Sequence, residues 1–350
     1  MENKLLKINW KFSAILALGI VLLPFPALAN VGTPLIWARI SHLLLGNAII
    51  GSAEAFLLTK LFHTPKWPSV WLLYAANYLS AWVGAFLLTN RLSSIPSITI
   101  ENAQIWLWIC VPFAFAVTLL IEYPFFWFLL RKQERSITKA IKATLIIHGI
   151  SYLLLFGWYS LSSQTSMLTQ LEVVAAQEIQ PQEEYELYFI TPDGKQVIRS
   201  NLEGKNQKVV KDLEAIERDS KLVVRQDEES RFDLLVDNEV ILTNFASLAG
   251  DRPQFYEEVT KLTENSDWEY RTIVWAAGGI IGNNQKENSG FQFAIETPFA
   301  AWRVSNATHL EGDAVVFQLG DNQVCILQPQ EKIIALIARG KEPVVVKPKS

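Results

Sequence analysis

Four long apolar segments restrict what the first 161 residues of this chain can fold into. They run at about 35–58, 69–89, 104–130 and 143–161. A helix rises about 1.5 Å per residue, so each segment is long enough to cross the roughly 30 Å hydrocarbon core of a bilayer. The sequence therefore predicts an α-helical transmembrane bundle of four helices.

A shorter apolar run precedes them, in residues 1–29. Three lysines come first, an apolar stretch of about twelve residues follows, and Ala27-Leu28-Ala29 ends the segment. Twelve helical residues rise only about 18 Å, which is too short to span a membrane. The small residues at its end are typical of a signal-peptidase site, so we interpret 1–29 as a cleaved signal peptide. An uncleaved fifth helix that continues through the prolines is the alternative.

Charge divides the chain near residue 161. The first part has a net charge of +7 and the second a net charge of −11, which together make the formal −4 of the whole chain. This division predicts a membrane domain at 30–161, a polar helical extension or linker at 162–184, and an extracytoplasmic domain at 185–350. Nucleic acid is an unfavourable partner, because the acidic half would repel phosphates.

The short loops between the apolar segments predict an orientation. Lys60 and Lys66 lie in one loop, and a cluster from Arg131 to Lys142 lies in another. The loop between them, at about 90–103, has one Arg and one Glu. The positive-inside rule places the basic loops and the N-terminus before any cleavage in the cytoplasm. We therefore expect a multi-pass protein of the cell membrane with its C-terminal domain on the opposite side.

Ionisable and amide side chains interrupt the apolar segments. At 1.5 Å per residue, Glu54, Glu122 and His148 fall in one layer, about 6–10 Å to the cytoplasmic side of the middle. Such groups are costly in lipid, so they are expected to face the bundle interior together with Asn47 and Asn77.

Two interpretations of this polar cluster remain open. Two carboxylates and an imidazole can bind a cation or relay protons. The same groups can also hold helices together by hydrogen bonds, and this second interpretation is favoured because nothing in the spacing requires a metal. Pro124 also leaves the carbonyl of Leu120 without its helical donor, one turn from Glu122.

Residues 185–350 contain short alternating segments separated by turns, which predict an all-β meander. "YELYFI" and "QVIRSNL" flank a Pro-Asp-Gly turn, and "AVVFQLGDNQVCILQPQEKIIALIA" predicts three successive strands. The repeated pattern of Phe189, Gly194 and Val197 with Phe317, Gly320 and Val324 resembles the blades of β-propellers. That resemblance implies a small propeller of at most four blades. A twisted sandwich or barrel explains the same hairpins.

Other candidate sites are weak. "GGIIGNN" at 278–284 is interpreted as a loop, and His309 as a structural residue. Cys110 and Cys325 lie in different halves and are interpreted as buried thiols. The motifs of zinc, serine and aspartyl intramembrane enzymes are missing from the helical segments, and so is a phosphate-binding Gly-rich loop. We therefore assign no catalytic residue, cofactor or metal, and the sequence favours a non-catalytic protein over an enzyme.

These expectations favour a polytopic membrane protein that anchors an outward β domain. Its partners would be the lipid bilayer and another membrane or extracytoplasmic protein, or a second copy of the chain. The alternative is a small transport or ion-coupling protein that uses the buried Glu54, Glu122 and His148 layer.

Overall fold

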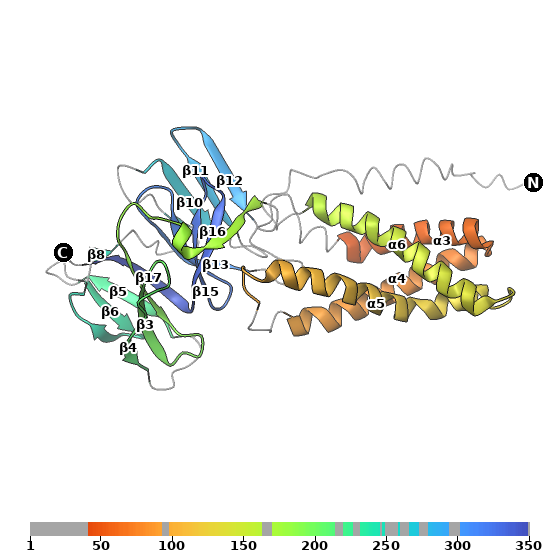
Figure 1. The fold of residues 1–350 in the computed structure, drawn as a ribbon, viewed down its shortest axis with the longest axis horizontal. Coiled ribbons are helices and arrows are strands. Elements are labelled where there is room, and N and C mark those ends of the chain that lie inside the picture. Colours follow the sequence, from red (N-terminus) through yellow and green to blue (C-terminus); the bar gives the residue numbers. More distant parts are fainter. Residues whose placement is uncertain are drawn as a thin grey trace, which may run out of the picture. The chain divides into compact units, whose positions relative to one another are not determined.

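A computed structural model of the chain describes residues 41–92, 98–162, 170–213, 220–226, 232–245, 247–248, 258–259, 266–272, 279–293 and 302–348. The segment 1–29, expected to be a signal peptide or first helix, lies outside the described residues, as do 35–40 of the first expected span. The chain divides into a helical unit (Met1–Ser94 and Trp108–Gln164) and a β-rich unit (Ile95–Leu107 and Thr165–Ser350) (Figure 1). The predicted order, helical first and β-rich second, is confirmed.

The described residues of the helical unit form a short π-helix and four α-helices. They are η1 (His42–Gly46), α3 (Asn47–Phe62), α4 (Lys66–Leu92), α5 (Ala103–Leu130) and α6 (Ser136–Ser162). Three helical segments are long and apolar enough to cross a membrane, namely His42–Phe62, Ala103–Leu130 and Ser136–Leu161. The fourth expected span, α4, is not among the candidate spans found in the described residues.

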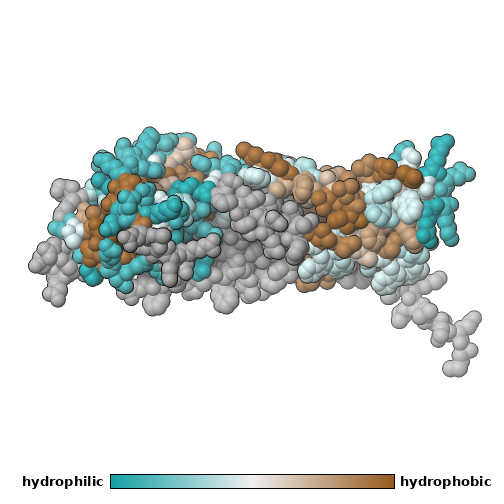
Figure 2. Space-filling view, turned by 90° about the horizontal axis from the view of Figure 1, so that it is seen from below, coloured by the Kyte–Doolittle hydropathy of each residue, from teal (hydrophilic) through white to brown (hydrophobic). Residues whose placement is uncertain are grey.

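Large apolar side chains point outward from the helical unit. Leu120 and Leu153 are 76% and 74% exposed, and Trp71 is 67% exposed. Figure 2 shows hydrophobic residues gathered on this unit, while the visible face of the β-rich unit is more hydrophilic. Water would not solvate such an outer surface favourably, so the helical unit is matched to an apolar surrounding.

Small residues allow α3 and α4 to pack closely. A Cβ atom placed on Gly51 would lie 2.9 Å from Cδ1 of Tyr74 and 3.3 Å from the backbone of Leu73. Ala55 and Ala76 are also fully buried in the apolar core of this unit. Helices in lipid associate by such close packing, because burial of apolar area gives no advantage there.

The β-rich unit is built of short strands. The first nine are β1 (Glu172–Ala175), β2 (Glu186–Ile190), β3 (Gln196–Asn201), β4 (Lys208–Asp212), β5 (Leu222–Gln226), β6 (Phe232–Val236), β7 (Glu239–Leu242), β8 (Ser247–Leu248) and β9 (Glu258–Val259). The others are β10 (Trp268–Thr272), β11 (Ile280–Asn284), β12 (Ser289–Phe293), β13 (Val304–His309), β14 (Val315–Leu319), β15 (Gln323–Gln328), β16 (Ile333–Arg339) and β17 (Lys341–Lys347). The three successive strands expected after residue 313 are β14, β15 and β16.

These strands form four sheets. Their strand orders are β1-β16-β15-β14-β13, β12-β11-β10-β9, β4-β3-β2-β17-β8 and β5-β6-β7. Consecutive strands within each sheet are mostly antiparallel hairpin neighbours, as in the expected meander. Three pairings depart from a simple meander: β17 returns to pair with β2 and with β8, and β1 lies parallel to β16.

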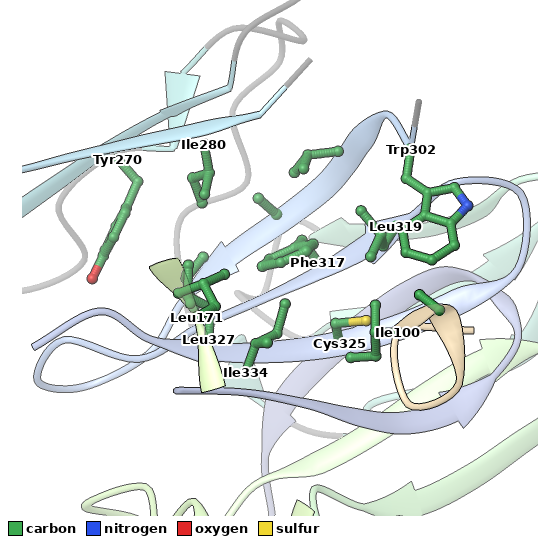
Figure 3. Packing of buried hydrophobic residues seen from close by; sticks show 14 of the residues in the cluster. Ile100, Leu171, Tyr270, Ile280, Trp302, Phe317, Leu319, Cys325, Leu327 and Ile334 are labelled. Atoms are coloured by element: carbon green, nitrogen blue, oxygen red, sulfur yellow. The ribbon is translucent and has the colours of Figure 1, made fainter. Parts of the chain in front are cut away.

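The first of these sheets is buried on both faces. Along β14, Val315, Phe317 and Leu319 enter one apolar cluster, while Val316 enters another. Side chains of a strand alternate between faces, so a strand covered on both sides needs an almost continuous apolar run such as "VVFQL". Figure 3 shows the first cluster, in which Tyr270 and Ile280 from the neighbouring sheet face Phe317.

The segment 162–184 differs from the helical extension or linker that its polar composition predicts. Residues 163–169 lie outside the described part, and β1 occupies Glu172–Ala175, followed by the 3-10 helix η2 (Ala176–Glu178). Val173 pairs with Ile334 of β16, so the segment is an edge strand. Two adjacent β-branched residues favour this extended conformation once a partner strand is present.

The connection between α4 and α5 also belongs to the β-rich unit. Ile98, Ile100 and Ala103 are buried in the same apolar cluster as Phe317. The backbone N–H of Ile100 donates to Oε1 of Gln323, at 2.8 Å. The segment that the sequence predicts as a short loop of the helical bundle is therefore part of the β core.

Candidate functional site

The site lies in the helical unit, where four helices each contribute polar side chains. Glu54 comes from α3, Glu122 from α5 and His148 from α6, and they are 2%, 1% and 1% exposed. One ligand atom from each of the three lies within 4.8 Å of the others. Glu54, Glu122 and His148, which helical rise alone places at one depth, are thus in contact distance of one another.

His148 lies between the two carboxylates. Its Nδ1 atom is 3.4 Å from Oε1 of Glu54, and its Nε2 atom is 3.3 Å from Oε2 of Glu122. The ring of Phe126 meets the imidazole edge-on, with 5.2 Å between ring centroids. This aromatic contact restricts how the imidazole can turn, so both nitrogens remain directed toward carboxylates.

Neutral donors hold the carboxylates in place. Ser151 Oγ donates to Oε1 of Glu54 at 2.6 Å, and Asn77 Nδ2 donates to its Oε2 at 2.7 Å. Ser80 Oγ donates to Oε1 of Glu122 at 2.5 Å. Asn77 and Ser80 are three residues apart on α4, and His148 and Ser151 are three apart on α6, so each pair shares one helix face.

Three polar atoms at the centre of the site have no hydrogen-bond partner among the described residues. They are Oε2 of Glu122 and both ring nitrogens of His148. The two ring nitrogens lie 3.4 Å from Oε1 of Glu54 and 3.3 Å from Oε2 of Glu122. Both distances exceed the 2.7–2.9 Å typical of a charge-assisted hydrogen bond. Buried polar atoms without a hydrogen-bond partner are rare and costly.

The net charge of the site depends on which of its groups are protonated. If both carboxylates are ionised, a protonated His148 leaves one excess negative charge in a buried position, where an isolated charge is unfavourable. Either a proton on one carboxylate or a bound cation removes this excess.

The two ends of the helical unit differ in what surrounds this site. Toward the loop that joins α5 and α6, the buried side chains include the apolar Phe126, Leu130 and Ala140 and also Thr144, whose hydroxyl donates to the carbonyl of Ala140 in its own helix. We call this the closed end. Toward the other end, which we call the polar end, the described side chains include two hydrogen-bonded polar pairs. These are Thr118 with Tyr152, 2.9 Å apart, and His42 with Tyr159, 2.7 Å apart.

Of the five residues that the sequence singles out, four form the site and one lies outside it. Asn77 contacts Glu54 directly. Asn47 is buried, but it is two turns away from Glu54 on α3 and its Nδ2 atom donates to the carbonyl of Leu43 in η1. Sequence reasoning missed Ser80 and Ser151 as donors, although their spacing from Asn77 and His148 places them on the same helix faces.

Candidate positions in the β-rich unit have structural surroundings. Most of the segment "GGIIGNN" forms β11 instead of the expected loop, and the ring of Phe291 packs against Gly282. His309 is fully buried and contacts Ser266 Oγ and the carbonyl of Gly312. The thiols of Cys110 and Cys325 are buried and unpaired, and burial raises the pKa of Cys325. A catalytic arrangement is not visible among these described residues.

Comparison with known proteins does not add a family to these observations. No protein-family model matches the chain, and no curated protein matches it. The site geometry therefore carries the functional argument.

Proposed function

We propose that this chain is an integral membrane protein whose helical unit binds and exchanges a cation at Glu54, His148 and Glu122. The observation that carries this proposal is the convergence of two carboxylates and an imidazole, with three of their buried polar atoms lacking a hydrogen-bond partner among the described residues. Ion sites and ion pathways are where ionisable side chains occur inside membrane proteins.

The placement in a membrane rests on the outer surface and the loops of the helical unit. Three helical segments have the length and hydropathy of membrane spans. The loops from α3 to α4 and from α5 to α6 lie together at the closed end, where Gln133 Nε2 donates to the carbonyl of Phe62. Lys60 and Lys66 flank the first loop, and Arg131, Lys132 and Arg135 lie in the second, so we propose that the closed end faces the cytoplasm.

The opposite connection supports the same orientation. Residues Ile98–Ala103, between α4 and α5, are part of the β core. An antiparallel arrangement of the membrane helices puts this connection on the side opposite to the two basic loops. We therefore propose that the β-rich unit lies outside the cytoplasm.

The polar end supports entry of the cation from that outer side. Tyr152 is one turn from His148 on α6, and its hydroxyl is bonded to Thr118. His42 and Tyr159 lie further toward the same end. These hydroxyls and the imidazole can replace part of the hydration shell of an entering ion, whereas most of the buried side chains between the site and the closed end are apolar.

The proposal is tested in liposomes that contain the purified full chain. A proton-sensitive dye and a dye that responds to Zn²⁺ and Mn²⁺ are enclosed separately, and a gradient of each cation is imposed. We expect wild-type chain to carry at least one of these cations faster than empty liposomes, and the double variant Glu54→Gln with Glu122→Gln to reduce that rate at least tenfold. Equal rates in the two proteins would contradict the proposal.

A second candidate function, favoured by the connection at Ile98–Ala103, is anchoring of a binding domain. Because this connection is built into the β core, the helices hold the β-rich unit by more than a single linker. In this case a partner protein would co-purify with the chain in mild detergent. The partner would remain with Glu54→Gln, Glu122→Gln and His148→Ala variants but be lost when residues 185–346 are deleted.

A further inference from the structure

We propose that the cation is a divalent transition-metal ion, bound by one ring nitrogen of His148 and by carboxylate oxygens of Glu54 and Glu122. This inference rests on the proposed function and identifies the chemical class of its ion. It can fail while the proposed function holds, if the site exchanges protons alone.

The spacing of the donor atoms is the first argument. Ligands of a tetrahedral ion at 2.0–2.2 Å lie about 3.3–3.6 Å from one another. The two nitrogen–oxygen distances, 3.4 and 3.3 Å, start from different ring nitrogens of His148, so only one of them can join two ligands of the same ion. The ligand atom of the third residue lies within 4.8 Å of the other two. The imidazole and one carboxylate are thus spaced like the ligands of an ion, and the second carboxylate lies close by.

The chemistry of the donors selects the class of ion. A neutral imidazole and two carboxylates are ligands that Zn²⁺, Mn²⁺ and similar ions accept. Mg²⁺ and Ca²⁺ prefer six or more oxygen ligands, and His148 offers nitrogen instead. A dipositive ion also cancels the charges of Glu54 and Glu122, so the complete site would be electrically neutral in its buried position.

The surrounding hydrogen bonds resemble those that orient metal ligands. Ser151 and Asn77 each hold one oxygen of Glu54, and Ser80 holds Oε1 of Glu122, which leaves its Oε2 directed at His148. When one nitrogen of His148 binds the ion, the other keeps its proton. The hydrogen bonds from Ser151, Asn77 and Ser80 are outer contacts of the kind that hold ligating carboxylates in place.

The test measures metal bound to the purified full chain in lipid nanodiscs. The protein is stripped with a chelator and dialysed against Zn²⁺, Co²⁺, Mn²⁺ or Mg²⁺, and bound metal is counted by mass spectrometry. We expect one Zn²⁺ or Co²⁺ per chain, no Mg²⁺, and a visible Co²⁺ absorption band typical of nitrogen and oxygen ligands. Glu54→Gln, Glu122→Gln and His148→Asn should each weaken Zn²⁺ binding at least 100-fold.

Three further variants keep the test informative if a ligand variant fails to fold. Ser151→Ala should weaken Zn²⁺ binding about 10- to 100-fold without removing a ligand. Glu134→Gln and His63→Asn are matched controls, since both side chains are exposed in the loops of the closed end. They should bind Zn²⁺ as the wild type does.

The outcomes separate the two proposals. Zn²⁺ binding that survives Glu54→Gln and His148→Asn would identify adventitious sites and overturn the inference. A chain that binds no transition metal but carries protons in liposomes would overturn the inference and leave the proposed function standing. A chain that neither binds nor carries any of these cations would overturn both.

Discussion

The helical unit buries Glu54, His148 and Glu122 and exposes leucine and tryptophan, whereas the β-rich unit buries an apolar cluster around Phe317 and exposes most of its charges. The first unit is arranged for an apolar surrounding and the second for water. In water, apolar burial provides most of the driving force for folding. In lipid this force between helices is missing, and close packing with polar contacts takes its place. The difference predicts that equivalent substitutions have different effects in the two units.

The largest effect is expected from Phe317→Ala. Phe317 is fully buried, so its truncation should lower the free energy of unfolding of the β-rich unit by about 3–5 kcal/mol. Hydrogen-exchange protection of the β14 and β15 amides measures this loss. The control is Val209→Ala on β4, where the side chain is 52% exposed and the effect should stay within about 0.5 kcal/mol. Equal losses in both variants would show that apolar burial does not stabilise this unit.

A substitution that adds volume should destabilise the helical unit. In Gly51→Val the new side chain meets Tyr74 and the backbone of Leu73, so α3 and α4 must separate, at a cost of about 1–3 kcal/mol. Unfolding by increasing SDS in mixed micelles measures this cost. Gly84→Val is the matched control, because no atom lies within 4 Å of a Cβ atom at that position. If the two variants unfold alike, close packing of α3 on α4 is not a source of stability.

A smaller effect is expected from Ser80→Ala, which removes a hydrogen bond to Glu122. Hydrogen bonds between membrane helices contribute about 0.6 kcal/mol on average and up to about 1.7 kcal/mol. The same SDS titration measures the change. Thr138→Ala is the control, since the side chain of Thr138 is exposed on α6. A larger loss for Thr138→Ala than for Ser80→Ala would contradict the importance of the buried polar contacts.

In the β-rich unit, the hydroxyl of Tyr185 accepts a hydrogen bond from the backbone N–H of Glu311. At neutral pH we expect Tyr185→Phe to have an effect about as small as that of Ser80→Ala. Removal of this hydrogen bond should cost about 0.5–1.5 kcal/mol. Burial raises the pKa of Tyr185 from 10.0 to about 12. The protonated form is therefore favoured by folding, and its stabilising contribution is complete below pH 10 and is lost as the pH rises through about 12.

Melting temperatures between pH 9 and pH 12 test this titration. We expect the wild type to lose stability faster with rising pH than Tyr185→Phe, so that the two curves approach each other. Curves that stay parallel over this range would show that Tyr185 ionises equally easily in the folded and unfolded states.

Local and periodic properties could be predicted from the sequence, and contacts between distant segments could not. The constant rise of a helix is enough to place Glu54, Glu122 and His148 at one depth. The rotation of each helix about its axis decides which other residues join them. For this reason Asn47 was expected in the cluster and lies outside it, while Ser80 and Ser151 form part of it.

The same limit applies to the β-rich unit. Alternation and turn residues predict the hairpins from β14 to β16. The pairing of β1 with β16 joins Val173 to Ile334 across a long stretch of chain, and local patterns carry no information on such a partner. For the same reason, composition predicts a linker at 162–184 where the structure has the edge strand β1. Gln and Glu are more numerous in this segment than the two valines of that strand.

The distance along the chain between Ile100 and Gln323 has a consequence for synthesis. These residues are 223 positions apart, and a ribosome that adds 5–20 residues per second needs roughly 10–45 s to cover that interval. During this time Ile98 and Ile100 are already synthesised, but the strands β14 and β15 that cover them are not. Chaperones or neighbouring lipid would have to shield this segment until translation is complete. A chain truncated before residue 302 would never acquire that cover, and we expect it to be recognised by membrane quality control and degraded.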